Sequence, residues 1–145
     1  MKPSLVSEYV EPGTVRFEFR DYAFRGPEAV QAAEAAACAA DQGAYWQYHD
    51  TLFLNQGGPN SFSLARLEQM AETLGLDTGA FNSCLDSGEK LAAVEASTAE
   101  AQAQGIDSTP TVLINGTEIA EWHDFNLVKQ AIDAELAVAT APEDR

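Results

Sequence analysis

The residues best suited to chemistry in this sequence are two cysteines. Cys38 and Cys84 lie 46 residues apart, so they form neither a Cys-x-x-C redox motif nor a zinc-binding pair. Each falls on the apolar side of an expected helix. Three interpretations follow from the residues alone: a catalytic or resolving thiol pair, a disulfide that joins two helices, or two buried free thiols.

A second candidate is the step Thr109-Pro110, which leads through Thr111 into the apolar run Val112-Leu113-Ile114. Proline has no N–H to give to a sheet ladder, so it is confined to strand starts, edges and bulges. An X-Pro bond held at such a junction can be cis, at a cost of about 0.5–1 kcal/mol. The step is either a functional loop or a plain turn that starts a strand.

Other possible ligands are few and scattered. His49 is three residues from both Trp46 and Leu52, on an apolar helix face, which indicates a core or rim histidine. His123 is expected in an exposed loop. Two isolated histidines do not make a metal site, and the acidic residues show no EF-hand-like spacing for calcium. The sequence therefore predicts no metal and no cofactor.

Length and composition indicate one soluble globular domain with an acidic surface. The chain has 145 residues and carries 23 acidic against 8 basic residues, which disfavours binding to nucleic acid or to an anionic membrane. Adaptation to high salt is the sharper alternative. No apolar run approaches the roughly 18 residues that span a bilayer. The N-terminus lacks an apolar h-region and is not a signal peptide, so any export signal is expected outside this chain.

Periodicity predicts the elements that must position these residues. Val15, Phe17 and Phe19 alternate with charged residues and predict a strand at 14–20. The alanine-rich stretch 27–42 is expected to be a helix with Val30, Ala33, Ala37 and Ala40 on one stripe. Residues 4–10 are expected to be the last two turns of a helix. Four further helices are expected at about 44–55, 63–75, 77–88 and 89–104. A hairpin of strands 111–114 and 117–120, a helix capped by Asp124 and a frayed tail at 139–145 complete the chain.

Several segments, in this order, resemble the DsbA-like thiol–disulfide oxidoreductases. They are Gly13 to Tyr22 with its Arg-Asp-Tyr ending, Ala32 to Gly43 followed by Trp46, His49, Asp50, Leu52 and Phe53, Phe81 to Gly88, and Gly105 to Thr111 with Ile114-Asn115-Gly116. The resemblance covers nearly the whole chain, and the joint order of the motifs makes it specific.

The resemblance implies an α/β, thioredoxin-like fold of the DsbA type. A helical insertion at about 27–104 would separate the second strand from the cis-proline hairpin, within a single domain over residues 1–138. The first strand of that fold is absent from this sequence. The strands at 14–20 and 111–114 would then face a gap with unpaired backbone groups. We expect either more sequence before Met1 or a strand borrowed from a partner.

The family also implies thiol–disulfide exchange on unfolded or cysteine-containing protein substrates, in an extracytoplasmic compartment and with a membrane redox partner. The chain has no Cys-x-x-C, so it contains no catalytic residue of the family's type. Ser108, Thr109 and Pro110 would bind an extended substrate. The resemblance favours a structural disulfide between Cys38 and Cys84. The alternatives are a redox-inactive peptide-binding module and a non-functional fragment.

Overall fold

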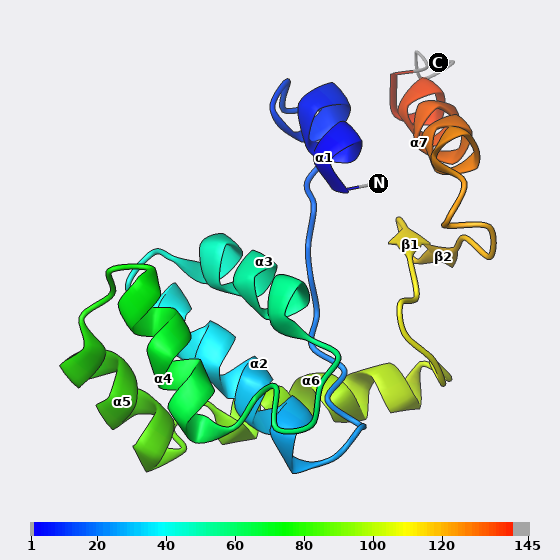
Figure 1. The fold of residues 1–145 in the computed structure, drawn as a ribbon. Helices are drawn as coiled ribbons and strands as arrows, with labels where there is room; N and C mark the ends of the chain where they lie inside the picture. The colour runs from blue at the N-terminus through cyan, green and yellow to red at the C-terminus, as the bar shows by residue number, and fades with distance from the viewer. Residues whose placement is uncertain (1, 141–145) are drawn as a thin grey trace. The chain divides into compact units, whose positions relative to one another are not determined.

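A computed structural model of the chain describes residues 2–140. Its contacts divide the chain into two compact units. The first unit combines the two ends of the chain, Met1–Phe19 and Ile106–Arg145. The second unit is the central stretch Arg20–Gly105, which contains the expected helical insertion. Each unit is described below by itself (Figure 1).

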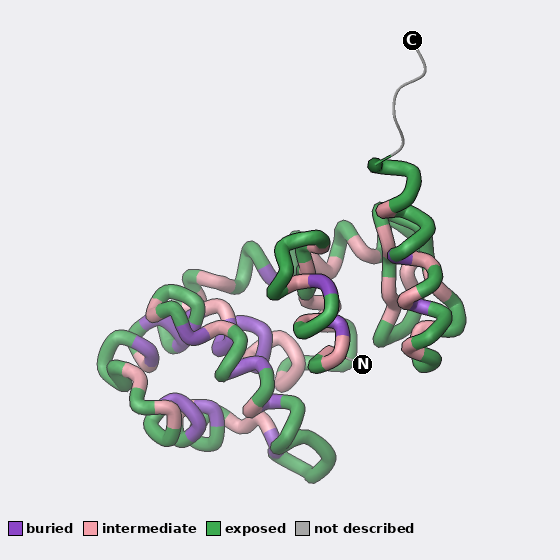
Figure 2. Tube along the Cα trace, turned by 90° about the horizontal axis from the view of Figure 1, so that it is seen from above, coloured by how far each residue is buried: buried purple, intermediate pink, exposed green. Residues whose placement is uncertain are grey.

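In the second unit, four helices gather around a fifth, α2 (Figure 1). Their bounds are α2 Pro27–Ala40, α3 Tyr45–Asn55, α4 Leu64–Thr73, α5 Thr78–Ser87 and α6 Leu91–Ala103. Helix α2 contacts all four of the others. Its alanines make this possible, because a small side chain lets neighbouring helices approach closely. The buried residues lie on the inner faces of these helices (Figure 2).

Three large side chains fill the core of this unit. Tyr48, Leu67 and Phe81 are fully buried, and the rings of Tyr48 and Phe81 have their centroids 5.3 Å apart. The hydroxyl of Tyr48 donates a hydrogen bond of 2.8 Å to the carbonyl of Leu67. A buried tyrosine thereby keeps its polar group satisfied while it joins α3 to α4.

The stripe expected on α2 is only partly right, because of its four residues only Ala33 is buried. Ala40 is exposed and Val30 is only partly buried, whereas Ala35, Ala36 and Ala39 are almost fully buried. The reason is that alanine occupies most positions of this helix. The sequence therefore offers little contrast between an apolar and a polar face.

The first unit contains the short helix α1 Lys2–Leu5, which continues into the π-helix η1 Val6–Val10. It also contains the antiparallel strands β1 Leu113–Ile114 and β2 Thr117–Glu118 and the helix α7 Phe125–Thr140. Its core residues are Leu5, Tyr9, Val128 and Ile132, with partly buried apolar side chains packed around them, among them Val15, Phe17, Ile114 and Ile119. This core lies between the helices and the hairpin.

Two expectations for the first unit need correction. Residues 15–20 form no strand; the sheet of the described residues contains only β1 and β2. Alternation identified an extended segment correctly, but a strand also needs a neighbour in register. Helix α7 runs to Thr140, so the tail begins later than residue 139, and residues 141–145 lie outside the described part of the chain.

Candidate functional site

The Thr-Pro step lies in an exposed loop just before β1. The Thr109-Pro110 peptide bond is cis, and Ser108, Thr109 and Pro110 are all exposed. The hydroxyl of Thr111 donates a hydrogen bond of 2.9 Å to the carbonyl of Ser108. This local bond spans the proline and fixes the shape of the loop.

The hairpin that follows attaches this loop to the core of the first unit. Leu113 pairs with Glu118 and Ile114 with Thr117, and the amide of Ile119 donates to the carbonyl of Val112 at 2.9 Å. The turn uses Asn115 and Gly116, whose φ angles of 48° and 85° match the positive values that a two-residue hairpin turn requires.

Helix α7 holds the same hairpin from the other side. The side-chain amide of Asn115 donates a hydrogen bond of 2.9 Å to the carboxylate of Glu135. Ile114 and Ile119 pack against the cluster that contains Val128 and Ile132 of α7. The base of the loop is therefore rigidly supported while its outer part faces solvent.

The backbone of this loop offers unused hydrogen-bonding groups. Within residues 2–140, no hydrogen bond involves the carbonyl of Thr109 or the amide of Thr111. A C=O and an N–H that have no partner on either side of a proline can pair with an extended polypeptide, as the edge of a sheet does. The arrangement can therefore hold a peptide through main-chain contacts.

The two cysteines are joined in a disulfide that connects α2 to α5. The S–S distance is 2.00 Å and the Cα atoms are 5.9 Å apart. The exposed fractions are 1% for Cys38 and 9% for Cys84, and both residues belong to the core cluster of the second unit. No cysteine is free, so the chain has no thiol to act as a nucleophile.

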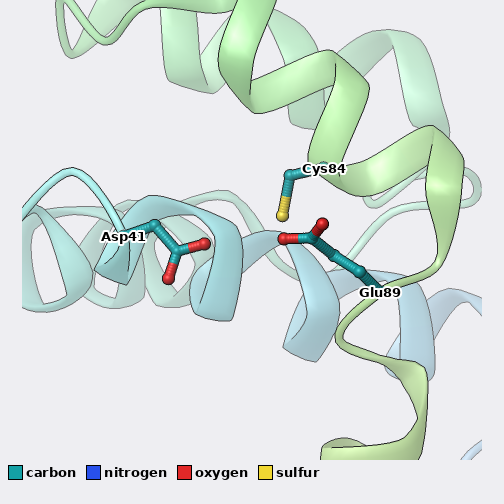
Figure 3. A group of neighbouring side chains, drawn as sticks. All are labelled: Asp41, Cys84 and Glu89. Atoms are coloured by element: carbon teal, nitrogen blue, oxygen red, sulfur yellow. The ribbon is translucent and has the colours of Figure 1, made fainter.

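Two carboxylates lie beside this disulfide (Figure 3). One oxygen each of Asp41 and Glu89 lies within 4.8 Å of the Cys84 sulfur. A disulfide sulfur carries no charge, and the ammonium group of Lys90 already lies 2.6 Å from Asp41 and 3.3 Å from Glu89. The group therefore does not fit a metal ion, because the bonded sulfur is not a thiolate ligand and both carboxylates are already paired with an ammonium group.

A half-buried acid in the second unit, Asp21, was not foreseen from the sequence. Burial raises the pKa of Asp21 from 3.8 to about 6, and the nearby Asp21 charge adds to the burial that raises the pKa of Tyr45. The chain around Asp21 is attached to α6, because Ser97 donates 2.7 Å to the Asp21 carbonyl and Ala23 donates 3.0 Å to Thr98. The only signal in the sequence was an aspartate at the end of an alternating run.

The two histidines have the surroundings predicted from the sequence, a core or rim position for His49 and an exposed loop for His123. His49 is 7% exposed, and its ring lies close to those of Tyr45, Trp46 and Phe53 on α3. Its Nδ1 lies 2.9 Å from a carboxylate oxygen of Asp50. His123 is exposed in the loop before α7. The two histidines therefore belong to separate units and form no common cluster.

Comparison with known proteins identifies the class of fold. The Thioredoxin_4 family model, described as thioredoxin, matches residues 1–134. A crystal structure of oxidised BdbD from Bacillus subtilis superposes with a TM-score of 0.83 and 24% identity, over 92% of this chain and 75% of that chain. The chain belongs to the thioredoxin family. The predicted thioredoxin-like fold, with its helical insertion and without its first strand, is confirmed.

The chain spans only part of the length of the curated relatives that it matches. Disulfide bond formation protein D of Bacillus subtilis is 25% identical over 92% of this chain and 63% of its own length. A Na(+)/H(+) antiporter NhaA of Herminiimonas arsenicoxydans is 34% identical over 75% of this chain, but the match spans only 17% of the antiporter. The predicted DsbA-type family resemblance is confirmed.

No helix within the described residues is long and apolar enough to cross a membrane.

Proposed function

We propose that this chain is the substrate-binding part of a DsbA-type thiol–disulfide oxidoreductase. The observation that carries the proposal is the exposed loop at Ser108, Thr109 and Pro110, whose free backbone groups flank a cis-proline on a thioredoxin-like fold. Such a loop fits an extended, unfolded segment of a cysteine-containing protein. A membrane redox partner would then restore the oxidation state of the enzyme.

The exchanging thiols come from outside these 145 residues. Cys38 and Cys84 are bonded to each other and buried, so the disulfide is a structural link between two helices. Its presence supports an oxidising, extracytoplasmic compartment, because such bonds are rare where glutathione keeps thiols reduced. The antiporter relatives do not enter the proposal, since the match spans only a small part of their length.

Binding can be tested with a fluorescein-labelled unstructured peptide that carries one alkylated cysteine. Thr111→Pro removes the amide N–H that would pair with the peptide. We expect about a three- to tenfold weaker Kd, the usual effect of one lost hydrogen bond. Thr111→Val is the matched control, because it loses the hydroxyl but keeps the amide. Equal affinity of the two variants, or no binding by the unmodified chain, would overturn the proposal.

An assay of catalysis on the same 145-residue chain distinguishes peptide binding from disulfide exchange. In an insulin-reduction assay with dithiothreitol, the 145-residue chain should not exceed the uncatalysed rate, because both of its sulfurs are bonded and buried. Turnover by this chain would show that Cys38 and Cys84 themselves exchange. Peptide binding without turnover is also the behaviour of a redox-inactive binding module, which the absence of a free thiol favours as the second candidate.

A further inference from the structure

The proposed substrates of this protein carry thiols, and these thiols could attack the Cys38–Cys84 disulfide. The resistance of this disulfide to exchange is therefore important. Exchange begins when a thiolate attacks one sulfur in line with the S–S bond. Cys84 is the more exposed of the two residues, at 9% against 1% for Cys38. An attacking thiolate would therefore bond to Cys84, and the electron pair of the broken S–S bond would go to Cys38, which then takes a proton.

The surroundings of Cys84 oppose this attack. Asp41 follows the last residue of α2 and Glu89 lies in the turn between α5 and α6, and both direct a carboxylate toward the sulfur (Figure 3). The ammonium group of Lys90 pairs with both carboxylates and neutralises one of their two negative charges. The three side chains together carry a net charge of −1 beside the more exposed of the two cysteines.

The surroundings of Cys38 disfavour its sulfur as a leaving group. Ala35 and Ala39 on the same helix are fully buried, and a thiolate is disfavoured in apolar surroundings. Glu34 lies one turn before Cys38, is 7% exposed, and has a carboxylate oxygen without a hydrogen-bond partner. Burial, helped by the charge of Glu95, raises the pKa of Glu34. Neither the apolar wall nor this acid can stabilise an anion on Cys38.

We infer that the carboxylate pair, Asp41 and Glu89, slows thiol–disulfide exchange at Cys38–Cys84 by repelling thiolates that approach Cys84. The pair thus keeps the link between α2 and α5 oxidised in the presence of thiol substrates. The biological need for this protection rests on the proposed function. The electrostatic effect itself does not, because it can be measured with small thiols and without any peptide.

The first experiment compares three small thiols of different charge. The thiolates of 2-mercaptoethanesulfonate, 2-mercaptoethanol and cysteamine carry net charges of about −2, −1 and 0 near neutral pH, as their ionisable groups dictate. Two thiols reduce the protein disulfide in succession and leave as the oxidised reagent. Free thiols of Cys38 and Cys84 are trapped with N-ethylmaleimide and counted by mass spectrometry, and rates are expressed per thiolate.

We expect cysteamine to react fastest and the sulfonate slowest, with about a three- to fivefold step for each unit of charge in low salt. The three rates should converge in 1 M salt, where the screening length falls to about 3 Å. Equal rates for the three thiols in low salt would overturn the inference. So would a rate that does not depend on thiol concentration, because unfolding would then control the reaction.

Single substitutions distinguish charge from loosened packing. Glu89→Gln and Asp41→Asn should each speed reduction by 2-mercaptoethanol about three- to fivefold. Lys90→Gln breaks the same ion pairs but removes a positive charge, so it should slow the reaction. Faster reduction of all three variants would mean that local opening is responsible and would overturn the inference. Asp86→Asn is the matched control, because its side chain points away from Cys84 two positions along α5.

Discussion

The buried carboxyl of Asp21 makes the stability of the second unit depend on pH in a definite direction. Burial raises its pKa in the folded protein to about 6, whereas the ordinary value is 3.8. Between these two pH values the folded protein binds more protons at Asp21 than the unfolded chain does. The contribution of Asp21 to stability therefore falls as the pH rises from about 4 to about 6, and above that range this contribution is at its lowest.

The size of the effect follows from the same two values. The difference between 3.8 and about 6, at about 1.4 kcal/mol for each pH unit, corresponds to about 3 kcal/mol. Asp21 retains some solvent exposure, so we expect an effect of about 2–3 kcal/mol. Asp21→Asn removes the ionisation but keeps the size of the side chain. The stability of the variant should therefore lack this part of the pH dependence.

The assay is urea unfolding at pH 4.0 and 7.5 of the chain and of Asp21→Asn, both carrying Trp122→Phe. Trp46 then reports on the second unit alone, because it is the remaining tryptophan and lies on α3. Relative to the parent, the variant should gain stability between the two pH values: the difference in the free energy of unfolding, variant minus parent, should be about 2–3 kcal/mol larger at pH 7.5 than at pH 4.0.

Asp86→Asn provides the control for this experiment. It makes the same chemical change at an exposed position of α5, and its difference from the parent should be nearly independent of pH. If Asp21→Asn behaved in the same way as this control, the burial of Asp21 would not raise its pKa and the reasoning would be refuted.

Two further predictions concern the helices of the second unit. Leu67→Ala should lower the free energy of unfolding by about 2–5 kcal/mol, because Leu67 is fully buried and its loss leaves a cavity; Leu67→Met, which keeps the volume, should cost under about 1.5 kcal/mol in the same urea titration. Asp77→Ala should cost about 1 kcal/mol, because the Asp77 carboxylate accepts the amide of Ala80 at 2.9 Å. Asp77→Asn keeps an acceptor and should retain most of this stability, so equal losses in both variants would contradict the capping role.

The helix boundaries could be predicted because their signals are local. Asp77 and Asp124 were expected to begin helices, and each accepts a backbone amide of the first turn. Gly88 was expected to close α5, and it adopts the left-handed φ of 66° that suits glycine after a helix. Such features depend on a few consecutive residues, so they are visible in a single sequence.

The failures concern features that depend on distant residues. Val15, Phe17 and Phe19 alternate as a strand would, but whether a ladder forms depends on the segment that lies alongside. In α2, the buried stripe could not be recognised among so many alanines, because the neighbouring helices decide which face is covered. Alternation and composition describe one segment at a time and carry no information about its neighbours.

The candidate sites divide in the same way. The Thr109-Pro110 loop was found from the sequence because its proline stands directly before an apolar strand. The partnership of Cys38 with Cys84 was left open by their spacing, and only the packing of α2 against α5 brings them together. The carboxylates of Asp41 and Glu89 gave no signal at all, because the end of α2 has to meet the stretch 84–89 before both carboxylates lie beside a sulfur.

Under the proposed function, the chain separates two requirements of disulfide exchange. Its exposed loop offers backbone groups for a substrate but no thiol, whereas its two sulfurs are bonded to each other, buried and flanked by carboxylates. An enzyme that handles thiols benefits from this separation, since a structural disulfide open to exchange would form mixed disulfides with its own substrates. The two properties are also independent in experiment. Thr111→Pro should weaken peptide binding without changing the reduction of Cys38–Cys84, and Glu89→Gln should do the reverse.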